Sequence, residues 1–277
     1  MLPFQLPRHL QGLLVSFALC SVCVSLPALA RCTRPLNVPV AATGLSIIDQ
    51  GDIISGIYPE ILRTIAAKEG CTFTITIVPR ARLEVMFESG KADLMIPATR
   101  TPHRDLYGLF VPLVRNRAML MSIQTSLPPV KTMQDLLAQS KTKVAVVRGF
   151  DYGERYQELL VELQKQGRLL VDTDPLSVAR LLKLGSADYV LMAPTILAGT
   201  SQTDPRVDDI VDHLRYEALA ELPWGESGVY FSKKSLSLED LNTLQEMFDR
   251  VARNGVVWKG FQRYYRAEFL REGIRPL

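Results

Sequence analysis

The hydrophobic pattern of the chain alternates between short apolar stretches and longer stretches with helical spacing. Strand-like stretches occupy residues 36–42 (LNVPVAA) and 72–78 (TFTITIV). Between them, residues 55–70 have apolar side chains three and four positions apart and stop at a glycine, which predicts a helix. A second helix is predicted at 81–89, and residues 94–97 (LMIP) form a short buried strand. This β-α-β-α-β order predicts a parallel sheet with right-handed crossovers.

The second half of the sequence repeats this alternation. A capping-box-like TMQD predicts a helix start at Thr132. Strands are predicted at 143–147 and 168–172, with a helix at 152–167 between them. Asp174 caps a further helix that has proline at its first position. These elements predict a second α/β unit.

Two segments are similar enough to suggest an internal repeat. ARLEVMFESGKADLMIP (81–97) and ARLLKLGSADYVLMAP (179–194) both run helix, Gly, Ala-Asp, apolar strand, Pro. We expect the glycine to end each helix, the aspartate to begin each strand and the proline to end it. Two lobes built on one plan would explain the repeat, and chance resemblance between common supersecondary units is the alternative. A strand at 229–234 and a helix capped by Ser237 follow.

The first 30 residues have the pattern of a secretory signal peptide. Arg8 and His9 precede an uncharged apolar core, and ALA at 28–30 offers a small-x-small cleavage site. An uncleaved membrane anchor is the alternative, because the apolar run approaches the roughly 20 residues that span a bilayer. We expect cleavage after residue 30 and a mature chain outside the cytoplasm.

The charge of the mature chain speaks against several classes of partner. Removing 30 residues leaves 277 − 30 = 247, with 31 basic and 29 acidic residues and a net charge of +2, since the removed segment contains Arg8 and no acid. A nearly neutral chain has no general basic surface for nucleic acid or for anionic membranes. At about 100–200 residues per domain, this length predicts two domains or one large one.

Only two cysteines remain once the predicted signal peptide is removed, Cys32 and Cys71. A pair of thiols in an oxidising compartment most simply forms one disulfide. Cys32 precedes the first predicted strand and Cys71 opens the second, so the two lie side by side if these strands are parallel neighbours. The bridge would close a loop of about 40 residues, worth roughly 3–4 kcal/mol. Two separate buried thiols are the alternative.

Motifs of several enzyme classes are missing from the mature sequence. It has two histidines, His103 and His213, and neither HExxH nor CxxC, which speaks against a zinc site. It has neither common glycine-rich nucleotide loop, and GESGV around Ser227 misses the nucleophile-elbow pattern by its last residue. We therefore predict no metal, no cofactor and no catalytic residue.

A basic loop, ATRTPHR at 98–104, follows the apolar LMIP strand. In open parallel α/β sheets, ligands bind beyond the carboxyl ends of the strands. A guanidinium there can pair with both oxygens of a carboxylate, which makes Arg104 a candidate ligand residue. Thr99 and Thr101 would add hydrogen bonds, and Arg100 would shape the local field. Loop arginines that simply face water are the alternative.

The corresponding loop of the second unit is VVRGFDYGER, 146–155. Backbone N–H groups at the following helix start could receive an anion. Phe150 and Tyr152 could offer an apolar face to a ligand, or could pack in the core of the lobe. Trp224, in a loop flanked by glycine and proline, could line the cleft or cover a hinge.

Together these features resemble a known family. The signal peptide, the two α/β units, GKADLMIPATRTPHR, VAVVRG, LGSADYVL and the final NG-terminated helix are similar to family 3 periplasmic solute-binding proteins, the extracellular amino-acid-binding proteins of ABC importers. The resemblance covers about residues 34–267. It implies an α/β, two-lobed Venus-flytrap fold of the type II periplasmic-binding-protein class, in which each lobe is a mainly parallel sheet flanked by helices. We expect lobe 1 at 31–123 plus 227–277, and lobe 2 at 124–226, with two crossover strands as the hinge.

The resemblance also implies roles for single residues. In that family, a loop that reads approximately S/T-x-T-x-x-R holds the α-carboxylate of the ligand. Thr101 and Arg104 align with its T-x-x-R, so Arg104 takes the carboxylate role, and Thr99 aligns with a ligand-binding hydroxyl residue. The acid that usually pairs with the α-ammonium is replaced by Ala193. The lobe-2 loop also departs from the family pattern, and its Asp151 could substitute for that acid.

The function implied is periplasmic binding of a small carboxylate-bearing solute, an amino acid or a related polar metabolite. A monomer would deliver the solute to an ABC-type permease or to a membrane sensor. An enzyme on the same scaffold is the alternative, since a cyclohexadienyl dehydratase shares this fold. His103, Asp151 or Glu226 would then supply the acid or base. A sensory or interaction domain that has lost transport is a third reading.

Overall fold

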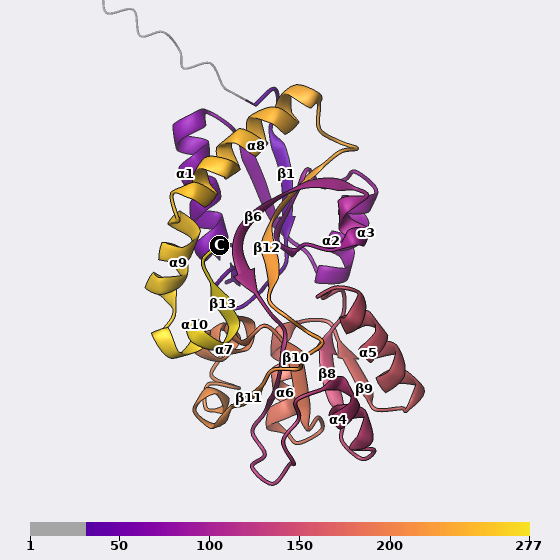
Figure 1. Ribbon diagram of the computed structural model, residues 1–277. Coiled ribbons are helices and arrows are strands. Elements are labelled where there is room, and N and C mark those ends of the chain that lie inside the picture. The colour runs from indigo at the N-terminus through magenta and orange to yellow at the C-terminus, as the bar shows by residue number, and fades with distance from the viewer. Residues whose placement is uncertain (1–31) are drawn as a thin grey trace, which may run out of the picture.

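A computed structural model of the protein describes residues 32–277, and the predicted signal peptide at residues 1–30 lies outside them. Residues 32–277 form two α/β lobes, one above the other in Figure 1, and the chain passes between them twice. In this part of the chain, no helix combines the length and the apolar character that a membrane span requires.

The first lobe contains the amino-terminal and carboxyl-terminal parts of the described chain. Its strands are β1 (Leu36–Val40), β2 (Ile48–Asp49), β3 (Ile54–Ser55), β4 (Phe73–Ile77), β5 (Leu94–Thr99), β6 (Gly108–Asn116), β12 (Gly225–Ser232) and β13 (Ile274–Arg275). Its helices are α1 (Ile57–Glu69), α2 (Arg80–Glu88), α3 (Pro102–Asp105), α8 (Leu238–Arg253), α9 (Val256–Tyr264) and α10 (Ala267–Gly273). Apolar residues of α1, α8 and α9 pack on one side of the sheets, and those of α2 pack on the other.

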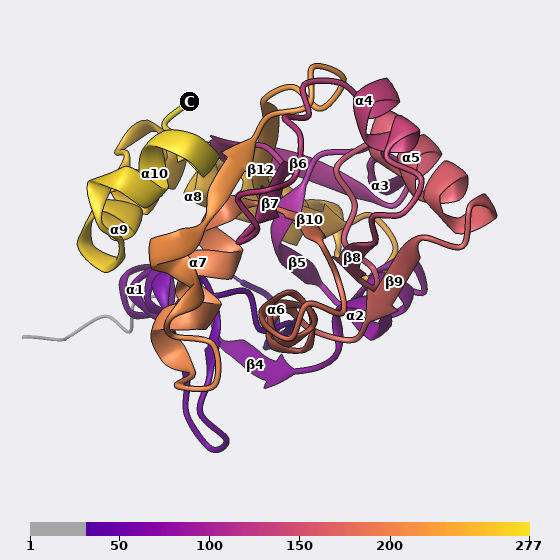
Figure 2. The same ribbon diagram turned by 90° about the horizontal axis from the view of Figure 1, so that it is seen from below.

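The second lobe is built around one five-stranded sheet in the order β11-β7-β10-β8-β9. Its strands are β7 (Met119–Ser122), β8 (Val144–Val147), β9 (Leu169–Asp172), β10 (Tyr189–Met192) and β11 (Arg215–Glu217). Its helices are α4 (Met133–Ala138), α5 (Glu154–Lys165), α6 (Pro175–Lys183), α7 (Pro194–Thr203) and the 3-10 turn η1 (Ile210–His213). Helices α4 and α5 cover one face of the sheet, and α6 and α7 cover the other (Figure 2).

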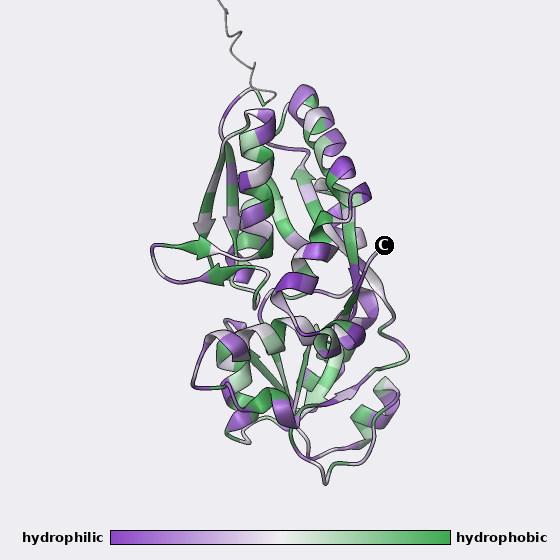
Figure 3. Ribbon diagram, turned by 90° about the vertical axis from the view of Figure 1, so that its left-hand side faces the viewer, coloured by the Kyte–Doolittle hydropathy of each residue, from purple (hydrophilic) through white to green (hydrophobic). Residues whose placement is uncertain are grey.

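The predicted two-lobed α/β class is confirmed, and the strand directions refine it. Strands that belong to successive β-α units pair in parallel, namely β1 with β4, and β8 with β9 and β10. Strands next to the crossovers pair antiparallel, as β12 does with β5 and β6, and β7 with β10 and β11. In Figure 3 the strands of both lobes are mainly hydrophobic, whereas hydrophilic residues recur along the helices.

The two crossover segments are residues 117–118, between β6 and β7, and residues 218–224, between β11 and β12. Strand pairing thus groups β7 with the second lobe, and the whole of β12 with the first. The lobe boundaries at 123/124 and 226/227 remain predictions that lie within a few residues of these segments.

The two halves of the internal repeat have equivalent backbone contacts. Oδ2 of Asp93 accepts a hydrogen bond from the backbone N of Asn37 at 2.7 Å, and Oδ2 of Asp188 accepts one from the backbone N of Lys143 at 2.7 Å. The aspartate at the start of one strand therefore holds the start of the neighbouring strand in both lobes. The prediction that proline ends each strand is wrong for Pro97, because β5 continues to Thr99.

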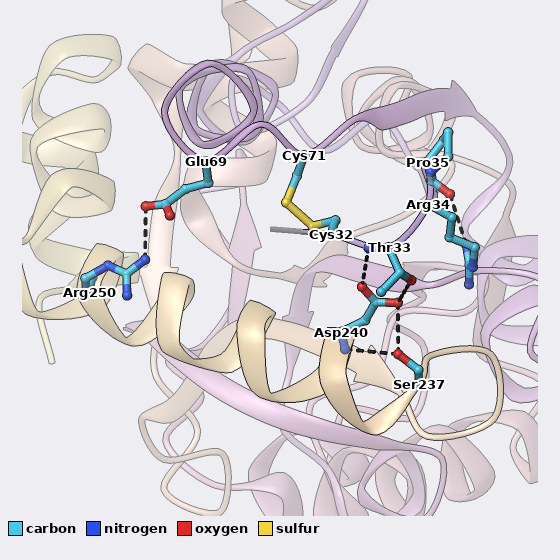
Figure 4. Close-up of a disulfide and its surroundings, with 9 residues drawn as sticks. All are labelled: Cys32, Thr33, Arg34, Pro35, Glu69, Cys71, Ser237, Asp240 and Arg250. Carbon is cyan, nitrogen blue, oxygen red and sulfur yellow. Dashed lines mark hydrogen bonds and ion pairs between the residues drawn. A yellow bond between two sulfur atoms is a disulfide. The ribbon is translucent and has the colours of Figure 1, made fainter. Parts of the chain in front are cut away.

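The predicted disulfide between Cys32 and Cys71 is confirmed, with a Cα–Cα distance of 5.1 Å (Figure 4). The adjacent Thr33 donates from its backbone N and from Oγ1 to the carboxylate of Asp240, at 2.9 and 2.6 Å. Asp240 also accepts a hydrogen bond from Ser237, the N-cap of α8. The start of the described chain is thus attached covalently beside β4 and by hydrogen bonds to α8.

The lobes touch directly where the loop after β1 meets α7. A Cβ on Gly199 of α7 would lie 2.5 Å from the backbone N of Leu45 and 2.6 Å from the hydroxyl of Tyr265. A Cβ on Gly44 would lie 2.8 Å from the carbonyl oxygen of Ile196. Glycine on both sides lets the two backbones approach, and α10 packs against α7 next to them. These residues therefore set how closely the lobes can approach.

We expect Gly199→Ala to lower the melting temperature by several degrees and to increase the radius of gyration measured by small-angle X-ray scattering. Overpacking at such a contact costs about 1–3 kcal/mol, which outweighs the gain of about 1 kcal/mol that alanine brings to a helix. Gln202→Ala, at an exposed position of the same helix, is the control and should change neither quantity. A more stable Gly199→Ala protein of unchanged radius would contradict this role.

Candidate functional site

Two cavities lie between the lobes. The larger, of about 480 Å³, is lined from the first lobe by residues 41–50 and 77–80, and from the second by residues 173–176 and by the end of α7. The smaller, of about 50 Å³, lies around the side chain of Arg104. Arg80 and Phe150 line both cavities, so the two are neighbours within one cleft.

Arg104 belongs to a three-residue charge cluster with Arg80 and Glu84. Glu84 Oε1 accepts hydrogen bonds from Arg80 Nη2 at 2.9 Å and from Arg104 Nη2 at 2.5 Å, and its Oε2 accepts one from Arg104 Nε at 3.1 Å. The arginines also donate to backbone carbonyls, Arg80 to Pro97 at 2.9 Å and Arg104 to Thr99 at 2.8 Å. Because Arg80 and Glu84 are one helical turn apart on α2, the helix presents both groups to the α3 turn.

The charge cluster leaves an excess positive charge inside the cleft. Only 6% of Arg80 and 3% of Arg104 is exposed to solvent, and the two cations share one carboxylate. Burial by itself would raise the pKa of Glu84, but the charges and hydrogen bonds of the two arginines outweigh it and lower that pKa. Glu84 is therefore ionised, and the cluster carries a net charge of +1.

The other residues of the basic loop have different surroundings. Thr101 is the N-cap of α3, and its Oγ1 accepts a hydrogen bond from the backbone N of Arg104, so it orients the turn. Thr99 lines the smaller cavity. Arg100 is half exposed, pairs with Asp105 at 3.2 Å and with Glu226 at 3.4 Å, and lines neither cavity. The structure thus separates the two arginines that the sequence places four residues apart.

The second-lobe loop contributes three of the predicted residues to the smaller cavity, Phe150, Asp151 and Tyr152. The carboxylate of Asp151 accepts hydrogen bonds from Gly153 N at 2.9 Å and from the Gln157 side chain at 3.0 Å. The hydroxyl of Tyr152 accepts one from the backbone N of Ala193 at 2.9 Å. Burial raises the pKa of Tyr152 to about 12, so the phenol is neutral. The neutral phenol of Tyr152 therefore lies next to residue 193, and Ala193 itself has no carboxylate.

Trp224 lies outside the lining of both cavities and covers the crossover region. The guanidinium groups of Arg117 and Arg275 lie over its ring, at 4.7 and 4.3 Å from the ring centroid. Arg117 also donates to the carbonyl oxygen of Glu272 at 2.9 Å. This arrangement joins both crossover segments to the carboxyl-terminal strand, and a role of Trp224 at the hinge stays a prediction.

The residues considered for catalysis are not brought together. His103 pairs with Glu88 at 2.9 Å on the surface, and Glu226 pairs with Arg100, so that of the three candidates only Asp151 lines a cavity. Among residues 32–277, no group of three or more His, Cys, Asp or Glu side chains has an arrangement suited to a metal ion.

Sequence reasoning missed Arg80, Glu84 and Asn116, which all lie at the cleft. The predicted helix begins at residue 81 and so leaves out Arg80, and the available signal was the spacing of four residues between Arg80 and Glu84. Asn116 offered no local signal, because it ends a strand whose partners come from distant parts of the chain.

Comparison with known proteins identifies the fold. No protein-family model matches the chain, and no curated protein matches it. A histidine kinase sensor domain with similarity to periplasmic binding proteins aligns with a TM-score of 0.67 at 18% identity, over 84% of this chain and 96% of that one. The arginine-, lysine-, histidine-binding protein ArtJ from Geobacillus stearothermophilus aligns with a TM-score of 0.66 at 17% identity, over 86% and 99%. The chain has the two-lobed periplasmic-binding-protein fold.

An ancestral amino-acid-binding protein, AncCDT-1, described as a precursor of cyclohexadienyl dehydratase, is also similar. It aligns with a TM-score of 0.64 at 15% identity, over 84% of this chain and 95% of that one. At such identities the likeness concerns the fold, and the function must be argued from the residues in the cleft.

Proposed function

We propose that the protein binds a small amino-acid-like solute between its two lobes. The observation that carries this proposal is the cavity of about 480 Å³, which is lined by residues of both lobes and adjoins the charge cluster at Arg80. Its volume lies within the range of about 300–1,000 Å³ that is usual for small-molecule sites. ArtJ and AncCDT-1, which share the fold, bind amino acids.

Arg104 is proposed to hold an anionic group of the solute, in keeping with its alignment to the carboxylate-binding position. A guanidinium has five N–H groups, and three of those on Arg104 bond to Glu84 and to the Thr99 carbonyl. Glu84 thus occupies the Nε edge and holds the guanidinium in place, while N–H groups on Nη1 and Nη2 remain for a ligand. The net charge of +1 on the cluster favours a carboxylate there.

The proposed setting is the periplasm, after cleavage of the signal peptide. We propose a monomer that presents its solute to an ABC-type permease or to a membrane sensor, with closure of the lobes as the signal. A histidine kinase sensor domain has a similar fold, and this similarity supports a membrane sensor as the second candidate partner, in addition to the permease.

The test is a thermal-shift and calorimetry screen of the mature protein against the L-amino acids. Loss of a charge-assisted hydrogen bond costs about 1.5–3 kcal/mol, so Arg104→Ala should weaken binding by about 10- to 150-fold at 1.4 kcal/mol per factor of ten. Arg100→Ala is the matched control, because Arg100 is exposed and lies outside both cavities. This variant should bind the solute with the affinity of the wild type. A folded Arg104→Ala protein with wild-type affinity would refute the role of Arg104.

A further inference from the structure

The two lobes meet a second time beside the cavities, where the loop after β8 reaches α2. A Cβ on Gly149 would lie 2.8 Å from the backbone N of Ala81 and 3.1 Å from the carbonyl carbon of Arg80. Gly149 has a φ of +83°, in the left-handed region that favours glycine. The loop of the second lobe is therefore in close backbone contact with the first turn of α2 in the first lobe.

The residues on either side of this contact mark the boundary between the two cavities. Arg80, from the first lobe, and Phe150, from the second, each line both the larger and the smaller cavity. Every other lining residue of the described chain belongs to one cavity alone. Arg80 and Phe150 therefore lie where the two cavities adjoin, one on each side of the cleft.

A solute that binds Arg104 has to extend across this boundary. Arg104 lines only the smaller cavity, whose volume is about 50 Å³. One water needs roughly 10–15 Å³, so the smaller cavity has room for a few atoms and not for a whole amino acid. The rest of the solute must occupy the larger cavity, of about 480 Å³, and its middle must pass between Arg80 and Phe150.

The two sides of the boundary differ in how firmly they are held. Arg80 donates to Glu84 Oε1 at 2.9 Å and to the carbonyl oxygen of Pro97 at 2.9 Å, so moving its guanidinium would break a buried ion pair. Phe150 has only apolar contacts for its side chain, with the core of the second lobe and edge-on with the ring of Tyr152. Phe150 is therefore the side of the boundary that can move.

We propose that Phe150 is a gate between the two cavities. The solute enters the larger cavity first, Phe150 then moves away from Arg80, and the anionic end of the solute reaches Arg104. After entry, Phe150 packs against the middle of the solute and slows its release. This inference rests on the proposed function, and it makes Phe150 a residue that sets the rates of binding and release.

The experiment measures association and dissociation rate constants by stopped-flow tryptophan fluorescence, with the mature protein and the L-amino acid that binds it most tightly in the screen. Substitutions at a binding site usually change dissociation and leave association nearly unchanged. Removal of a gate is different, so Phe150→Ala should raise the association rate constant about tenfold, and dissociation by at least as much. Phe150→Leu, with a smaller apolar side chain, should lie between the two. Val161→Ala, at an exposed apolar position of α5, is the control and should change neither rate.

Each outcome bears on a different statement. Faster dissociation of Phe150→Ala with unchanged association would make Phe150 a simple contact residue, which overturns the gate and leaves the proposed function standing. Unchanged rates, or a wild type that already associates at the diffusion limit, would overturn the gate in the same way. If Phe150→Ala does not fold, the association rate of Phe150→Leu decides. A wild-type protein that binds none of the amino acids would overturn the proposed function and this inference together.

Discussion

Glu84→Ala is expected to lower the free energy of unfolding by about 3–5 kcal/mol, because removing one partner of a buried ion pair leaves its charge uncompensated. Here the loss affects two cations, since Arg80 and Arg104 are almost completely buried and share this carboxylate. Urea denaturation of the mature protein, with its disulfide intact, measures the change. The position of Arg104 depends on the same contacts, so solute affinity should also fall.

The control for this prediction is Glu88→Ala, one turn further along α2. Glu88 pairs with His103 at the surface, where its side chain is 36% exposed and that of His103 57%. Exposed ion pairs contribute about 0–1 kcal/mol, so this substitution should have a small effect. If Glu84→Ala and Glu88→Ala lowered the free energy of unfolding by similar amounts, the charge cluster would not be a stabilising element.

The stabilisation from Glu84 should also depend on pH in a defined direction. Its pKa is lower in the folded protein than its ordinary value of 4.5. A carboxyl with a lowered folded pKa stabilises the protein above its unfolded pKa, and this contribution is lost as the pH falls through the folded pKa. The stability difference between the wild type and Glu84→Gln should therefore be full at neutral pH and narrow below about pH 4.

The double substitution of Cys32 and Cys71 by serine should lower the free energy of unfolding by about 3–4 kcal/mol, as expected for a bridge that closes a loop of this length. The two residues are 39 positions apart, and the bridge limits the conformations of the unfolded chain over that whole span. It also keeps Thr33 next to Asp240, so some loosening of the start of α8 should accompany the loss. Urea denaturation measures the change.

Reduction of the wild type separates the disulfide from the side-chain change. The wild type treated with dithiothreitol should unfold at the same urea concentration as the double variant, and the double variant should not respond to the reductant. Unchanged stability of the wild type after verified reduction would contradict the prediction. Cys20 and Cys23, in the predicted signal peptide, are absent from the mature protein used for this test.

Much of the fold could be predicted because its signals act over a few residues. The capping box of Thr132 and Asp135, the cap at Asp174 and the cap at Ser237 all form between positions three apart. The disulfide could be predicted because only two cysteines follow the predicted signal peptide. Strand direction was harder, because β12 pairs with β5 and β6, more than a hundred residues earlier in the chain.

By itself the sequence determined the α/β units, their helix ends, the disulfide and the basic loop that holds Arg104, because each depends on local spacing or on residue count. Only the tertiary structure decided what surrounds that loop. It brought Glu84 into contact with Arg104, the Tyr152 hydroxyl into contact with the backbone N of Ala193, and Asn116 into the lining of the smaller cavity. These neighbours come from different lobes and distant strands. Only the packing of the folded chain brings them together, and no local sequence pattern predicts these contacts.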